Sequence, residues 1–166
     1  VHRSPYPAAS TAIGLAIAAD PDAGYTLTDR LSRGFGVFRE GDSGESVHFD
    51  PLVDRDEVVS LTRDAVVMRR YRPVHTTGWF RFVEYSALDE HGQPRGDIAP
   101  FADVVFPFAP GLQGKSAEEL RGMPVEHLAD GPEVEEKYVI DPHGIIDVHI
   151  TDLETGYSMT TSLRGA

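Results

Sequence analysis

The chain has 166 residues, a formal net charge of −12 and 40% hydrophobic residues, which is the composition of a globular domain with a sizeable core. The negative charge argues against a nucleic-acid partner, because phosphates would repel it. No cysteine is present, so disulfides, thiol catalysis and thiolate metal sites are excluded. No apolar run reaches the roughly 18 residues that a membrane-spanning helix needs.

The N-terminal region is rich in alanine, and its composition predicts a helix from about Pro7 to Ala19. The residues 20–24 combine aspartate, proline and glycine, which is typical of a linker. A short run, Tyr25–Asp29, follows it. From Leu31 onward, short apolar runs separated by Gly, Asp and Pro predict a series of strands.

The most apolar of the central strands are expected at 65–68, 79–85 and 101–110. Ser116 and Glu119 match a capping box, so we expect one short helix over Ala117–Arg121.

The segment 133–157 carries the strongest pattern and predicts three strands joined by two tight turns. Val134, Glu136, Tyr138 and Ile140 fall on one face of the first strand, and such period-two alternation indicates one buried and one solvated face. Pro142 presets a turn, and Gly144 and Gly156 can take the positive φ that tight turns need. The fold class expected is therefore mainly β, an antiparallel β-sandwich with an N-terminal helix and one short inserted helix.

The last strands carry a recurring set of turn and strand residues, namely Asp141, Gly144, Ile145, Ile146, Val148, Asp152, Thr155 and Gly156. In this set they resemble the end of the substrate-binding β domain of the Hsp70 (DnaK-like) chaperone family. The Ala-rich N-terminal segment after Ser4-Pro5-Tyr6-Pro7 looks like the last helix of the family's ATPase domain. Asp29 corresponds to the linker Asp of the family, although the run before it is half threonine. Compared with the family, which usually has a shorter connection at this point, the residues 97–131 look like an elaboration of the fold.

The resemblance implies a C-terminal fragment of a bacterial, cytoplasmic chaperone. Residues 1–22 would be the end of the ATPase domain with the linker, and residues 23–166 a substrate-binding-like β-sandwich. The fragment itself would not be an enzyme and would hold no cofactor, since ATP and magnesium belong to the missing upstream domain. The N-terminal helix would be free for self-association.

By the same resemblance, extended or unfolded polypeptides are the expected partners, bound between loops at one end of the sandwich. Aligning the central strands with the family implies a peptide-binding set, with Tyr71 as an arch residue over the peptide and Gly78 reshaping the pocket: Val37, Met68, Tyr71, Gly78 and Phe80. The apolar members are equally compatible with a plain core. The alternative function is a degenerate Hsp70-like scaffold that binds one dedicated partner protein.

Other motifs have simpler interpretations. The string 41–44, Gly-Asp-Ser-Gly, matches the surroundings of a serine nucleophile, but only His2 precedes it as a base, so a turn is favoured over a hydrolase that uses Ser43. Arg95-Gly96-Asp97 and Asp89-Glu90-His91-Gly92 are expected to be solvated turns. The seven histidines lack metal-site spacing. Arg69, Arg70 and Arg72 are expected to pair with acidic side chains rather than to capture an anion.

Overall fold

The computed structural model describes residues 28–30, 33–41, 46–54, 58–60, 64–141 and 145–163, together with isolated positions before residue 17. The helix expected over Pro7–Ala19, the linker at 20–24 and the loop at 42–45 therefore lie almost wholly outside the described residues. The same holds for the boundary expected at residue 22.

Strands dominate the described residues from position 28 onward. The elements are, in chain order, β1 (Thr28–Arg30), β2 (Gly34–Gly41), β3 (Ser46–Val53), β4 (Val58–Ser60), β5 (Ala65–Tyr71), β6 (Thr77–Leu88), β7 (Pro94–Pro107), the 3-10 helix η3 (Pro110–Leu112), α2 (Ala117–Arg121), β8 (Val134–Ile140), β9 (Ile146–Asp152) and β10 (Ser158–Leu163).

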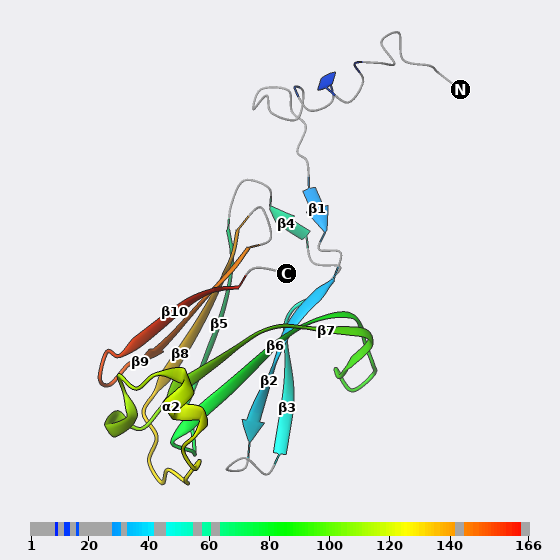
Figure 1. Cartoon of the computed structure of the whole chain (residues 1–166). Helices are drawn as coiled ribbons and strands as arrows, with labels where there is room; N and C mark the ends of the chain where they lie inside the picture. The colour runs from blue at the N-terminus through cyan, green and yellow to red at the C-terminus, as the bar shows by residue number, and fades with distance from the viewer. Residues whose placement is uncertain are drawn as a thin grey trace.

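Two antiparallel sheets of four strands face each other, as Figure 1 shows. One has the strand order β3-β2-β6-β7 and is called the β2 sheet below; the other has the order β10-β9-β8-β5 and is called the β8 sheet. β1 and β4 pair separately. The expected antiparallel arrangement of a mainly β chain is confirmed, with the three C-terminal strands paired in sequence order.

The core lies between the two sheets because both present alternating apolar side chains to each other. In β8, Val134, Glu136, Tyr138 and Ile140 all point into this layer and are buried, as their spacing predicts. The apolar residues that fill the layer from the two sheets include Phe35, Val37, Phe80, Phe82, Phe106, Phe108, Val148, Ile150 and Leu163. One carboxylate, Glu136, is therefore surrounded by this core.

The turn between β9 and β10 explains the Asp-x-x-Thr-Gly pattern. The Oδ1 atom of Asp152 accepts hydrogen bonds from the backbone N–H groups of Glu154 (2.9 Å) and Thr155 (3.0 Å). Gln113 donates to the Oδ2 atom at 2.8 Å. Gly156 has a φ of 75°, a conformation that glycine adopts without strain. Burial raises the pKa of Asp152, but these hydrogen bonds outweigh it and lower the pKa below its ordinary value.

The short helix α2 begins at the predicted capping box. The Oγ atom of Ser116 accepts from the backbone N–H of Glu119 (3.2 Å), and the Glu119 carboxylate accepts from the backbone N–H of Ser116 (2.8 Å). The turn expected at Asp89–Gly92 is present, with Gly92 at a φ of 73°. The expectation for Arg95–Asp97 is wrong, because these residues lie within β7, where β6 and β7 shift register around Gly96.

Replacing Asp152 by alanine removes the acceptor of three hydrogen bonds, two of them from the backbone of the turn. We expect the free energy of unfolding to fall by about 3 kcal/mol, since each hydrogen bond to a charged group contributes roughly 1.5–3 kcal/mol before the chain relaxes. Asp147→Ala on the opposite face of β9 is the matched control and should change it by less than about 1 kcal/mol. If urea titrations show an equal loss in the free energy of unfolding for the two variants, this role for Asp152 is contradicted.

Candidate functional site

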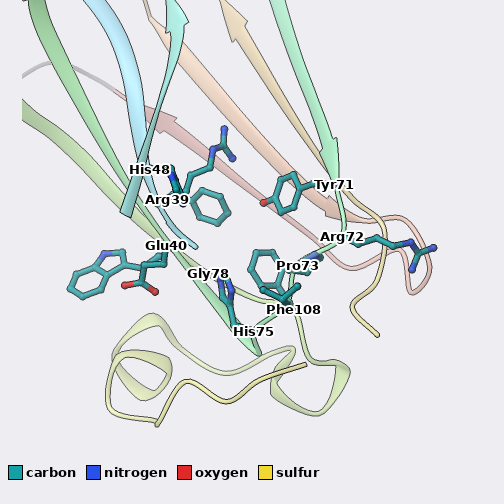
Figure 2. A pocket seen from close by; sticks show the side chains of 12 residues that line it. Arg39, Glu40, His48, Tyr71, Arg72, Pro73, His75, Gly78 and Phe108 are labelled. Carbon is teal, nitrogen blue, oxygen red and sulfur yellow. The ribbon is translucent and has the colours of Figure 1, made fainter. Parts of the chain in front are cut away.

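A pocket of about 220 Å³ opens at the end of the sandwich where β2, β5 and β7 end and β6 begins. Figure 2 shows Arg39, Glu40 and His48 on one side, Tyr71, Arg72 and Pro73 on the other, and His75, Gly78 and Phe108 between them. Val74, Trp79 and Phe80 complete the lining. Both sheets and the segment after β5 thus contribute walls, and most of the wall is aromatic or aliphatic.

Below the pocket, one buried carboxylate joins the two sheets. Glu136 of β8 has no exposed surface and accepts hydrogen bonds from Arg39 of β2, from Tyr138, and from the Tyr71 hydroxyl at 2.5 Å. Arg39 and Tyr71 also line the pocket. An unpaired carboxylate at this depth would be strongly destabilising, so these three donors make its burial possible.

The groups around Glu136 keep the protonation states that this network needs. Burial by itself would lower the pKa of Arg39, but the negative charge of Glu136 raises it above its ordinary value. Burial, and then the charge of Glu136, raise the pKa of both Tyr71 and Tyr138. The guanidinium therefore stays charged, and both phenols stay protonated and donate to the carboxylate.

The network continues toward solvent through Asp50 of β3. Arg39 donates to Asp50 at 2.9 Å, and Arg69 of β5 donates to both its carboxylate oxygens at 3.1 and 3.2 Å. Two cations therefore face two carboxylates across the sheets. Arg70 pairs with Glu135, and Arg72 with Glu154 and, at longer range, Asp130. The expectation that these arginines pair with acidic side chains is confirmed.

The far wall of the pocket is built from His75 and Phe108. Their rings lie edge to face, with centroids 5.5 Å apart. His75 is 7% exposed, and among the described residues its Nδ1 atom has no hydrogen-bond partner. Burial lowers the pKa of His75 below 6.5, against the opposing charge of Glu40. The imidazole is therefore neutral near pH 7 and behaves as part of an apolar wall.

Part of the elaboration at 97–131 holds the pocket segment 72–76 in place. Backbone bonds join Thr76 N–H to the Glu126 carbonyl (2.9 Å) and Leu128 N–H to the Val74 carbonyl (2.7 Å). Arg72 donates to the Gly131 carbonyl at 2.7 Å. A Cβ atom at Gly131 would lie 2.0 Å from the Pro73 carbonyl oxygen, so only glycine allows this close approach. The wall is thus fixed on both sides of Val74.

The structure brings together three of the five residues expected to bind peptide, namely Tyr71, Gly78 and Phe80. Val37 is fully buried in the core between the sheets. Met68 is 46% exposed and lies on the outer face of β5, opposite to Tyr71. Tyr71 itself differs from the arch expected, because its hydroxyl is held by Glu136 and its ring forms a wall of the pocket.

Sequence reasoning did not single out Arg39, His75, Phe108 or Glu136 as parts of a site. Glu136 could have been identified from the sequence, because it occupies an inward position between Val134 and Tyr138, where a buried charge needs hydrogen-bond or ion-pair partners. Two of the three partners, Tyr71 and Arg39, come from strands 65 and 97 residues away in the sequence, so local patterns could not identify them.

A comparison with protein-family models finds no match, and a comparison with curated proteins also finds none. No helix among the described residues is both long enough and apolar enough to span a bilayer. Across the same part of the chain, no three His, Asp or Glu side chains are grouped so that they could hold a metal ion.

Replacing Glu136 by glutamine keeps the shape of the side chain but leaves Arg39 without its buried counterion. We expect the free energy of unfolding to fall by about 3 kcal/mol, as when one partner of a buried ion pair is removed. Glu135→Gln is the control one residue away, since its partner Arg70 is largely exposed, and it should cost less than about 1 kcal/mol. Similar urea midpoints for the two variants would show that the buried network contributes little.

The lowered pKa of His75 predicts a pH dependence of stability. Between 6.5 and the lower folded-state pKa, the unfolded chain binds more protons than the folded chain, so stability falls as the pH falls through this window. His75→Gln removes this contribution. As the pH falls from about 7.5 to about 5, the free energy of unfolding of the variant should therefore rise relative to that of the wild type. Parallel pH profiles for wild type and His75→Gln would refute the prediction.

Proposed function

We propose that this chain binds extended polypeptide segments and takes one apolar side chain of the segment into the pocket of Figure 2, as the peptide-binding domain of an Hsp70-family chaperone. The observation that carries the proposal is the convergence of Tyr71, Gly78 and Phe80 in one apolar pocket at the end of the sandwich. The proposal assigns binding to this site and no chemical step.

The size and lining of the pocket support a single side chain as its occupant. A cavity of about 150 Å³ lined by apolar side chains is known to hold a benzene molecule, so about 220 Å³ accommodates one ring or one branched aliphatic side chain. Burial of such a group contributes roughly 1.5–3 kcal/mol. An extended segment can add backbone hydrogen bonds outside the pocket, which gives affinity that does not depend on sequence.

A scaffold function, with one dedicated partner protein, is the second candidate. It is favoured by the way residues 126–131 fix the segment 72–76, because a fixed wall suits one partner better than many. A peptide array distinguishes the two functions. Binding to many unrelated apolar peptides supports the chaperone, whereas binding to none, together with capture of one folded protein, supports the scaffold.

Two exposed valines allow a matched test of the pocket. Val74 lines the pocket and is 43% exposed, while Val66 is 51% exposed on the outer face of β5. Val74→Glu places a charge that an apolar side chain would have to desolvate, so affinity for an apolar peptide should fall by about tenfold or more. Val66→Glu should leave the affinity unchanged. Equal affinities of the two folded variants in fluorescence anisotropy would place peptide binding elsewhere.

A further inference from the structure

Gly78 and Phe108 together determine the shape of the inner wall of the pocket. A Cβ atom at Gly78 would lie 2.5 Å from Cε2 and 2.6 Å from Cζ of Phe108, so the Phe108 ring occupies the space that a side chain at position 78 would need. The backbone of Phe108 is fixed there because its N–H donates to the Thr76 carbonyl at 2.9 Å. The aromatic ring of Phe108, which directly follows β7, thus fills the space beside Gly78 of β6.

The rings around Phe108 leave an aromatic surface rather than a generic apolar one. Tyr71, His75 and Phe80 each lie edge to face with Phe108, at centroid distances of 6.3, 5.5 and 6.3 Å and interplanar angles of 85°, 72° and 77°. The hydroxyl of Tyr71 is held by Glu136, so its ring cannot turn freely. All four rings line the pocket.

Arg39 adds a positive charge at the face of two of these rings. Its guanidinium carbon lies 5.8 Å from the centroid of Tyr71 and 5.7 Å from that of Phe80, and it also lines the pocket. Its charge is balanced by Glu136 and Asp50, and Arg72, the other arginine in the lining, pairs with Glu154. An anionic side chain therefore gains little here, whereas a neutral ring can meet both ring edges and the guanidinium.

We propose that the pocket selects an aromatic side chain over an aliphatic side chain of equal volume, and that Phe108 determines this selectivity. The ligand class is an extended peptide with a phenylalanine, tyrosine or tryptophan at the position that enters the pocket. An aliphatic guest of the same size is buried equally well but lacks a quadrupole to match the ring edges and the Arg39 guanidinium. This proposal rests on the proposed peptide-binding function.

Four peptides that differ at one central position test the selectivity. The central residue is phenylalanine, cyclohexylalanine, leucine or alanine, with flanking residues unchanged, and binding to the whole chain is measured by calorimetry. Cyclohexylalanine carries a saturated six-membered ring that is thicker than the flat ring of phenylalanine and more apolar, so burial alone predicts that it binds at least as tightly. Leucine, which is smaller than both, controls for the added thickness. We expect phenylalanine to bind roughly 2-fold to 10-fold tighter than cyclohexylalanine.

The contribution of Phe108 is tested with the same peptides. In Phe108→Leu the ratio of the phenylalanine affinity to the cyclohexylalanine affinity should fall to about one, and this ratio does not depend on the folded fraction of the variant. Phe101→Leu is the matched control, because Phe101 lies in β7, the strand that leads to Phe108, packs against Phe35 and does not line the pocket. Its ratio should equal that of the wild type.

The outcomes separate this proposal from the function on which it rests. If the cyclohexylalanine or leucine peptide binds as tightly as the phenylalanine peptide, or more tightly, the aromatic selectivity is wrong, while the proposed peptide binding still holds. A preference for phenylalanine that persists in Phe108→Leu would overturn the role of Phe108. Failure of all four peptides to bind would overturn both the selectivity and the proposed function.

Discussion

The burial of Glu136 is the constraint on which the arrangement of the site depends. A carboxylate with no exposed surface, in the middle of an apolar layer, must be met by donors from whichever elements face it. Arg39 reaches it from the opposite sheet, and Tyr71 and Tyr138 reach it from its own sheet. The distance between the sheets, the direction of Arg39 and the rotation of the Tyr71 ring are therefore determined together.

The pocket follows from this constraint. Two of its lining side chains, Arg39 and Tyr71, are held from beneath by the same carboxylate, and Phe80 lies against the guanidinium. The remaining wall depends on the close approach of Gly131 to Pro73 and on the Phe108 ring that fills the space at Gly78. The core and the pocket are thus one packed unit, and a ligand would meet walls that are already in place, which lowers the entropy lost on binding.

The sequence predicted those features that depend on neighbouring residues. The alternation in β8 and β9, the capping box of α2 and the turn at Gly156 all rest on contacts within a few positions. The site was less accessible to prediction, since Met68 and Tyr71 belong to one strand but face opposite sides, and Val37 fits a core as well as a pocket. Which inward residue ends in a pocket depends on the facing sheet, and no local pattern encodes that.

In the function that we propose, a peptide side chain enters between Tyr71, Phe80 and Phe108. Nuclear Overhauser contacts between a phenylalanine-centred peptide with a labelled ring and the isotope-labelled chain test it most directly. We expect contacts from the peptide ring to the rings of Phe80 and Phe108 and to the methyl groups of Val74, all of which line the pocket. Contacts instead to Met68 and Val66, on the outer face of β5, would contradict it.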